Sequence, residues 1–346
     1  MKLVLLISVF VIFFSCKTSY DSKKTSEQSE LFLIDDYDQQ INYAKTITAS
    51  ELKKDIYIFA SDSMEGRATG EIGQKKAAEF LKERYSLLNI PNPKGTDSYF
   101  QEIPEAFFNG RITGNSENVL AYIEGTTYPD ELLVVSAHYD HLGIEDDGSI
   151  YNGADDDASG TMGLVQIAEA FALAKKEGKG PKRSILFLHV TGEEIGLYGS
   201  RYYTENPIFP LKNTIANLNV DMIGRVDDNH INDRDYIYLI GSDRLSKELH
   251  DISELVNEKY SQFDFDYTFN EESDPNRFYY RSDHYNFAKH NIPIIFYFNG
   301  VHDDYHETTD TPEKIEYDLL VKRCRLIFHT AWELANRNDR VKLLKK

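Results

Sequence analysis

The sequence predicts an α/β fold, with a single domain of three layers, α/β/α, built on a mixed, mostly parallel central sheet. Helix-like and strand-like segments alternate from about residue 45 to the C-terminus. The strand-like segments are short apolar runs rich in Val, Ile, Leu and Tyr, as expected for strands that helices cover on both faces. Histidines and acidic residues follow several of these runs directly, and open α/β sheets place their sites at that edge.

The expected helices carry apolar residues at helical spacing, and they are 50–60, 73–88, 159–174, 242–259, 283–289 and 312–336. The expected strands are NVLAYIEG (118–125), ELLVVSAH (131–138), SILFLHVT (184–191), TIANLNVD (214–221), DYIYLIG (235–241) and IPIIFYFN (292–299). No internal repeat or low-complexity tract interrupts this alternation. Residues 45–340 are therefore expected to form one domain.

The charge of the chain argues against one class of partner. The sequence has 57 acidic and 38 basic residues, for a formal net charge of −19 at pH 7. Such a surface repels nucleic acid and anionic lipid. Because 41% of the residues are hydrophobic, a sizeable core is expected, and the protein should be globular.

The N-terminus has the pattern of an export signal. Lys2 precedes an apolar run, LVLLISVFVIFFS, that is too short to span a bilayer comfortably. The run ends at Cys16, and FFSC resembles the lipobox of bacterial lipoproteins, although the usual leucine is missing from its first position. An ordinary signal peptide is the alternative. We expect a signal peptide at 1–16, a lipid anchor at Cys16, a flexible tether at 17–44, and an exported protein of the cell envelope, in the periplasm or at the outer membrane.

The second cysteine, Cys324, is expected to be structural. It lies in LLVKRCRLIFHTAWELA, where apolar residues recur at helical spacing. A buried thiol on such a face packs as a small apolar group. With Cys16 at the proposed anchor, no disulfide is expected within the mature chain.

The segment HYDHLG supplies the first candidate metal ligand. His138 and Asp140 are two residues apart at the end of an expected strand, so both side chains point to one side if the strand continues. Asp140 could then orient the imidazole of His138, as carboxylates commonly do for zinc-bound histidines. Taken alone, a histidine packed at a strand end would be the simpler interpretation, and we adopt it for His141.

The segment GADDDASG supplies a candidate bridge between two cations. Two divalent ions a few ångströms apart need an anionic group between them, and we assign this role to Asp156. For Asp155 and Asp157, electrostatic support of the helix that follows, or support of the neighbouring metal ligand, is as good an interpretation as direct catalysis. Ser159 is placed to cap that helix.

The segment TGEEIGLYGS places two acids directly after a buried strand. One carboxylate can bind metal while the other accepts the proton of a water that the metal activates. We assign Glu194 as ligand and Glu193 as general base. In isolation the signal is weak, because Glu-Glu pairs are common on solvated helices.

NVDMIGR and YHETTDTPEKI complete the candidate ligands with Asp221 and His306. A set of histidines and carboxylates without thiolate suits zinc. Two ions are expected, one held by His138, Asp156 and Asp221, and the other by Asp156, Glu194 and His306. The sequence lacks the GxSxG, HExxH, GxxxxGKS and GxGxxG motifs of other common enzyme classes.

These segments, in this order, resemble the M28 family of zinc peptidases, from IFASDSMEGRATG to the C-terminal helix. The resemblance implies a phosphorylase/hydrolase-like zinc peptidase fold, two Zn²⁺ ions, and the roles assigned above. It also implies that Tyr279 of FYYRSDHYNF polarises the scissile carbonyl, with Tyr280 a weaker candidate, and that the Asp156–Asp157 peptide is cis. Because only a short stretch joins the early helices to NVLAYIEG, the protease-associated insert of many relatives is expected to be absent.

The expected activity is that of an aminopeptidase acting on peptides with a free N-terminus. The aromatic and acidic segment FDFDYTFNEESDPNRFYY could border a pocket for an apolar side chain and attract an ammonium, although a surface loop would look the same. Dipeptidase and carboxypeptidase activities share these ligands and remain open. A single-zinc acyltransferase similar to glutaminyl cyclase also remains open, as does an envelope binding lipoprotein whose hydrolase site has decayed.

Overall fold

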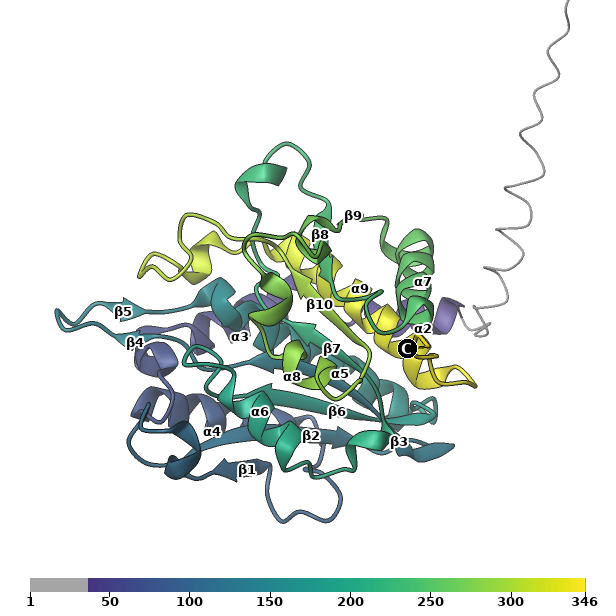
Figure 1. The fold of residues 1–346 in the computed structure, drawn as a ribbon, viewed down its shortest axis with the longest axis horizontal. Helices are drawn as coiled ribbons and strands as arrows, with labels where there is room; N and C mark the ends of the chain where they lie inside the picture. Colours follow the sequence, from purple (N-terminus) through teal and green to yellow (C-terminus); the bar gives the residue numbers. More distant parts are fainter. Residues whose placement is uncertain (1–36, 346) are drawn as a thin grey trace, which may run out of the picture.

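The computed structural model describes residues 37–345 (Figure 1). The predictions of a signal peptide and a lipid anchor at Cys16 lie outside these residues. Within them, no helix is both long and apolar enough to cross a membrane.

One mixed sheet of eight strands forms the centre of the fold, in the order β1-β2-β6-β3-β7-β10-β8-β9. The strands β6, β3, β7 and β10 are mutually parallel, β2 and β8 run antiparallel to their inner neighbours, and β1 and β9 lie at the edges. The bounds are β1 Phe100–Ile103, β2 Ser116–Ile123, β3 Tyr128–His138, β6 Arg183–Val190, β7 Thr214–Val220, β8 Tyr236–Ile240, β9 Asp264–Asp266 and β10 Ile294–Phe298. A separate hairpin joins β4 Gly143–Ile144 and β5 Ile150–Tyr151.

Helices cover both faces of the sheet, which confirms the predicted three layers, although the layers are unequal. One face packs against α2 Tyr37–Ala44, α3 Ala49–Phe59, α4 Ile72–Leu87, α5 Gly160–Lys176, α7 Lys247–Val256 and α9 Tyr317–Asn336. The other packs against the shorter helices α6 Tyr198–Glu205 and α8 His284–Ala288. Neighbouring strand residues point to opposite faces, so Val119 joins the larger core and Leu120 the smaller one.

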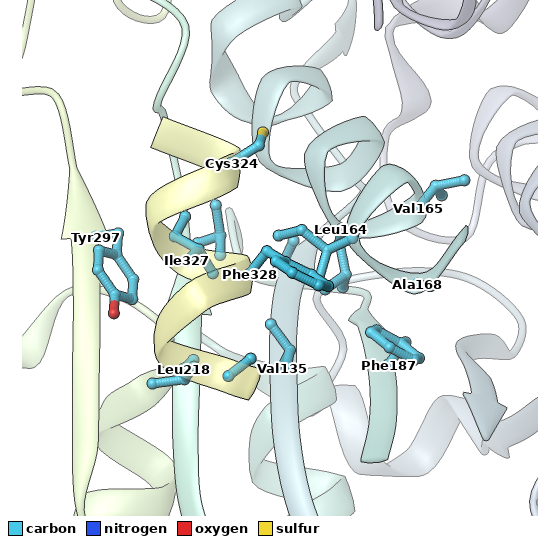
Figure 2. Packing of buried hydrophobic residues seen from close by; sticks show 14 of the residues in the cluster. Val135, Leu164, Val165, Ala168, Phe187, Leu218, Tyr297, Cys324, Ile327 and Phe328 are labelled. Carbon is cyan, nitrogen blue, oxygen red and sulfur yellow. The ribbon is translucent and has the colours of Figure 1, made fainter. Parts of the chain in front are cut away.

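Aromatic residues of α5 and α9 fill the larger core. Figure 2 shows Phe328 of α9 beside the α5 residues that pack over the sheet. The ring centroid of Phe171 lies 4.9 Å from that of Phe328 and 5.6 Å from that of Trp332. Burying each such side chain stabilises the fold by about 1.5–3 kcal/mol, so this stack anchors both helices to the sheet.

The prediction of a tether through residue 44 is wrong at its end, because residues 37–44 form helix α2. The ring of Tyr43 stacks on Trp332 at a centroid distance of 5.6 Å, and its hydroxyl donates to Glu177 at 2.7 Å. The side-chain amide of Gln40 donates to the carbonyl of His329. Residues 37–44 are therefore part of the folded domain.

Other differences from the predicted elements arise at helix ends and sheet edges. Ser246 accepts the backbone N–H of Leu249 and starts α7 later than predicted. The predicted helix 312–336 divides into a 3₁₀ turn, Pro312–Lys314, and α9. Ser159 does not cap α5, since its hydroxyl donates to Asp155 instead. The short elements α6, β1 and β9 were not predicted.

Cys324 is fully buried, and burial raises the pKa of its thiol to about 12, which confirms the structural interpretation. Because the thiolate is the reactive form, we expect iodoacetamide to leave Cys324 unmodified in the native protein and to alkylate it once guanidinium chloride unfolds the chain. Peptide mass spectrometry reads the modification at this position. Alkylation of Cys324 at the same rate with and without denaturant would contradict the placement.

Candidate metal centre

The candidate ligands meet at the carboxyl ends of three adjacent parallel strands. His138 ends β3, Glu193 and Glu194 follow β6, and Asp221 follows β7. Strand β3 lies between the other two, with Ser136 opposite Leu188 on one side and Asn219 on the other. This shared edge of the sheet brings residues that are distant in sequence into one cluster, as predicted.

Asp156 lies between the two candidate histidine ligands. Its Oδ1 is 3.1 Å from Nε2 of His138, and its Oδ2 is 3.2 Å from Nε2 of His306. One carboxylate thus faces a different imidazole with each oxygen. This is the geometry required of a group that bridges two cations.

The remaining ligands complete two groups around this carboxylate. Asp221 Oδ1 lies 3.5 Å from Nε2 of His138, and Glu194 Oε2 lies 3.2 Å from Nε2 of His306. All of these carboxylates are buried, whereas His306 is 37% exposed and opens the cluster to solvent. Nitrogen and carboxylate oxygen donors at such spacing, without a thiolate, fit zinc.

The buried carboxylates of the cluster need positive charge to compensate their own. Burial opposes ionisation of Asp156, but hydrogen bonds from His138 and His306 hold its pKa well below the usual value. Burial opposes protonation of His138, but Asp221 and Asp156 raise its pKa well above the usual value. Protons on the imidazoles or bound cations can meet this demand, and the donor set fits the cations.

Glu193 has the environment of a proton acceptor. Burial raises the pKa of its carboxyl well above the usual value, and Glu194 and Asp221 add like-charge repulsion. A carboxylate with a raised pKa accepts a proton more readily near neutral pH. Its backbone N–H donates to Asp140 Oδ1 at 3.2 Å, which fixes the start of the loop after β6.

The predicted role of Asp140 needs correction. Nδ1 of His138 faces the backbone carbonyl of Asp140 at 3.1 Å, while the nearest carboxylate oxygen is 3.9 Å away. The side-chain alternation assumed in the prediction does not apply, because β3 ends at His138. The carboxylate instead accepts the hydroxyl of Thr69 and the N–H of Glu193. Asp140 therefore orients the imidazole through its main chain.

His141 is not the isolated packed histidine that the sequence suggested. Its Nδ1 lies 2.7 Å from Glu194 Oε1 and 3.8 Å from Asp156 Oδ2. Its Nε2 is buried, without a hydrogen-bond partner among the described residues. His141 thus holds the oxygen of Glu194 that faces away from His306.

Asp155 and Asp157 support the loop around Asp156. Oδ1 of Asp155 accepts the N–H of Gly224 at 2.7 Å, and Oδ1 of Asp157 accepts the N–H of Met222 at 2.9 Å. The Asp156–Asp157 peptide is cis, as the family resemblance implied. Asp310 accepts the backbone N–H groups of both Asp155 and Asp156. These bonds fix the position of the shared carboxylate.

The structure does not bring Tyr279 to the cluster. Its ring lies against Arg244, whose guanidinium carbon is 4.0 Å from the ring centroid. The tyrosine that lines the cleft is Tyr305, whose ring stacks on His306 at a centroid distance of 3.9 Å. Its position next to His306 in the sequence was the available signal. Burial, reinforced by Asp156 and Glu194, raises the pKa of Tyr305, so the hydroxyl stays protonated and can donate.

Apolar side chains form the other wall of the cleft. They are Met222, Phe278, Phe296 and Phe298, and they lie beside the ligands. Of the predicted pocket segment 263–280, only Phe278 lines the cleft. The cleft therefore has an apolar wall next to the candidate metal ligands.

Arg67 is fully buried and braces the loops that carry the ligands. Its guanidinium donates to the carbonyls of Tyr139 and Gly153, which adjoin His138 and the aspartate loop, and also to those of Phe59 and Asn152. Burial lowers its pKa to about 10, although Asp156 and Asp310 oppose this shift. The sequence showed an Arg in SMEGR without indicating this role.

The chain is similar to a known peptidase family and to parts of larger known proteins. The model of peptidase family M28 matches residues 118–331. Aminopeptidase NAALADL1 of Rattus norvegicus is 33% identical over 132 residues, which are 38% of this chain and 17% of that protein. A probable zinc metalloprotease of Pyrenophora tritici-repentis is 40% identical over 116 residues, which are 31% of this chain and 22% of that protein. The matched region thus spans less than a quarter of either relative.

Solved structures share the fold at low sequence identity. LapB from Legionella pneumophila has a TM-score of 0.70 and 22% identity, with 92% of this chain and 83% of that chain covered. BSAP, a zinc aminopeptidase from Bacillus subtilis, has a TM-score of 0.64 and 15% identity, with 86% and 98% covered. Glutaminyl cyclase from Porphyromonas gingivalis has a TM-score of 0.63 and 16% identity, with 82% and 97% covered. These matches confirm the α/β fold.

The role of Arg67 predicts a large loss of stability on substitution. Arg67→Met leaves four carbonyls without this donor, three of them buried, at roughly 1–3 kcal/mol for each buried group, so the free energy of unfolding should fall by at least about 3 kcal/mol. Denaturant titration measures the loss. Arg234→Met, in an ion pair whose arginine is 50% exposed, is the control and should change stability by less than about 0.5 kcal/mol. Equal losses in the two variants would contradict the bracing role.

The contact between His141 and Glu194 predicts weaker metal binding on substitution. Removing a group that orients a metal ligand typically costs about 10- to 100-fold in affinity, so His141→Ala should bind zinc correspondingly less tightly. Competition with a chromophoric chelator measures the affinity. The exposed His290→Gln is the matched control. Unchanged zinc affinity in His141→Ala would show that this contact is incidental.

Proposed function

Since the chain belongs to peptidase family M28, we propose that it is a zinc-dependent exopeptidase, specifically an aminopeptidase that uses two zinc ions. The observation that carries the proposal is the placement of Asp156, which presents one oxygen to each of two histidines. A single-ion site needs no such shared carboxylate. In the proposal, His138 and Asp221 hold one ion, Glu194 and His306 hold the other, and Asp156 binds both.

Zinc bound in this cluster would supply a water nucleophile at neutral pH, by lowering the pKa of water to about 7, and would polarise a carbonyl oxygen. Glu193 accepts the proton of the attacking water and returns it to the leaving nitrogen. Its partly buried position at the cluster and its raised pKa suit both transfers. Asp140 holds the backbone of Glu193 in place for this role.

In the proposed mechanism, Tyr305 donates a hydrogen bond to the oxygen of the scissile carbonyl. It lines the cleft beside His306, and its raised pKa keeps the hydroxyl protonated. A donor aimed at the developing oxyanion typically contributes about 10²–10³-fold to kcat. The predicted candidate Tyr279 lies against Arg244, so we assign this role to Tyr305 instead.

The substrate would be a peptide with a free N-terminus. An apolar first side chain fits the wall of Met222, Phe278, Phe296 and Phe298. The acidic groups of the cleft can attract the ammonium.

We further propose that the protein is exported and anchored by lipid at Cys16. Release of a Cys16→Ser variant into the soluble fraction would support this anchor.

A single-zinc acyltransferase similar to glutaminyl cyclase is the second candidate, favoured by the match to that fold. The two functions differ in metal content and product. We expect plasma mass spectrometry to find two zinc ions per chain, and peptides with N-terminal glutamine to be cleaved rather than cyclised. One tightly bound zinc together with cyclisation would select the acyltransferase.

Glu193→Gln tests the catalytic base. The amide cannot accept the proton, so kcat for aminoacyl-arylamide hydrolysis should fall by roughly 10²–10⁴-fold while zinc content stays unchanged. Glu271→Gln, at an exposed position, is the control. Equal rates for Glu193→Gln and the native protein would refute the assignment.

Removal of metal should destabilise the fold. Asp156, Glu194 and Asp221 converge on one cluster, and without cations their charges repel. At a free zinc concentration 100-fold above Kd, bound ions stabilise the fold by about 2.7 kcal/mol per site. We therefore expect chelation to lower Tm and abolish activity, and added zinc to restore both. A chelator that removes all zinc without changing Tm or activity would contradict the proposal.

A further inference from the structure

One arginine, Arg281, is among the residues that line the cleft, together with the candidate ligands and several aromatic side chains. Arg281 is exposed and lines the cleft together with Asp156, Glu194 and Asp221. Its guanidinium carbon lies 4.8 Å from the ring centroid of Phe278, and its Nη2 lies 3.5 Å from the hydroxyl of Tyr305. The two aromatic side chains hold the guanidinium at the entrance to the metal cluster.

The backbone next to Arg281 is fixed to a metal ligand. Ser282 donates its hydroxyl to Asp221 Oδ2 at 2.6 Å and accepts the amide of Asn219 at 2.9 Å. Tyr305 is likewise the neighbour of His306. Arg281 therefore has a defined position relative to the ligands, although its own side chain is exposed.

Arg281 has no carboxylate partner within the part of the chain that the structure describes. Other arginines near the centre do: Arg225, for example, donates to Asp304 at 2.8 Å. In a chain with a net charge of −19, an exposed guanidinium at the mouth of an acidic cleft is available to a ligand. Its planar fork matches a carboxylate with two parallel hydrogen bonds.

We propose that Arg281 binds a carboxylate of the substrate and so determines specificity at the proposed aminopeptidase site. This inference rests on the proposed function and names the substrate class, which is peptides that place a carboxylate about one residue from the scissile bond. The carboxylate is either the free C-terminus of a dipeptide or the side chain of an acidic residue.

The test compares substrates that differ only by that charge, with the zinc-loaded full chain. One arm pairs Leu-Gly with Leu-Gly amide, and the other pairs Glu-p-nitroanilide with Gln-p-nitroanilide. In at least one arm, the native protein should have a higher kcat/KM for the substrate with the carboxylate than for its neutral partner. Arg281→Gln should reduce this ratio by about tenfold or more, mainly because KM for the charged substrate rises. The zinc content should stay the same, and the loss of kcat/KM on the neutral substrates should be smaller than the loss on their charged partners.

Two variants separate recognition from structural damage. Arg281→Lys keeps the charge but not the fork, and should retain part of the preference. Arg277→Gln removes a nearby exposed arginine that packs on Tyr280 outside the cleft, and should retain all of it. If Arg281→Gln changes the preference in the dipeptide arm, the bound carboxylate is the C-terminus. If it changes the preference in the anilide arm, the bound carboxylate is the acidic side chain. Equal effects of Arg281→Gln on charged and neutral substrates in both arms would overturn the proposal.

Binding provides a readout that is independent of turnover. Calorimetric titration of Glu193→Gln with the same peptides should show tighter binding of the carboxylate member, and this difference should be lost when Arg281→Gln is added. If the native protein cleaves none of the peptides, the proposed function fails, but this titration still decides the role of Arg281. Equal affinities with and without Arg281 would refute it.

Discussion

The organisation of the site follows from one constraint: Asp156 must present its two oxygens to two histidines while buried among other carboxylates. A buried cluster of like charges is costly unless positive charge compensates it. Here the compensation comes from the imidazoles and, in our account, from bound cations. The surrounding bonds serve this geometry, because Asp310 holds the backbone of the aspartate loop and Arg67 ties that loop to the end of β3. Without these supports, repulsion among the carboxylates would spread the cluster.

The sheet positions His138, Glu194 and Asp221 at the ends of neighbouring strands. These central strands could be predicted from sequence. Short segments dominated by apolar residues, such as 184–191, have few structural alternatives to a strand covered on both faces. Helix α2 was missed because YDQQINYA is polar and buries few side chains, among them Tyr43 and Ala44. Edge strands β1 and β9 are short and half-exposed, so they lack the apolar signature. Their pairing depends on a neighbouring strand that is distant in sequence.

The candidate ligands could be predicted because each is a histidine or an acidic residue at a strand end or in a loop. The residues that orient these ligands could not be predicted. Arg67, His141 and Arg281 act through tertiary contacts, and nothing in their local sequence distinguishes them from ordinary surface or core residues. Asp140 shows the limit of periodicity, since the expected alternation failed where β3 stopped. Tyr305 replaced Tyr279 in the cleft because the chain turns Tyr279 toward Arg244. Sequence therefore predicted the candidate ligands, and the fold was needed to find the residues that orient them.

The central claim is that Asp156 is shared by two zinc ions. Anomalous diffraction from crystals of the zinc-loaded protein, recorded on both sides of the zinc absorption edge, tests it most directly. The account predicts two zinc peaks a few ångströms apart, with Oδ1 of Asp156 on the ion bound by His138 and Oδ2 on the ion bound by His306. A single peak in fully zinc-loaded crystals, or two peaks of which only one contacts Asp156, would contradict it.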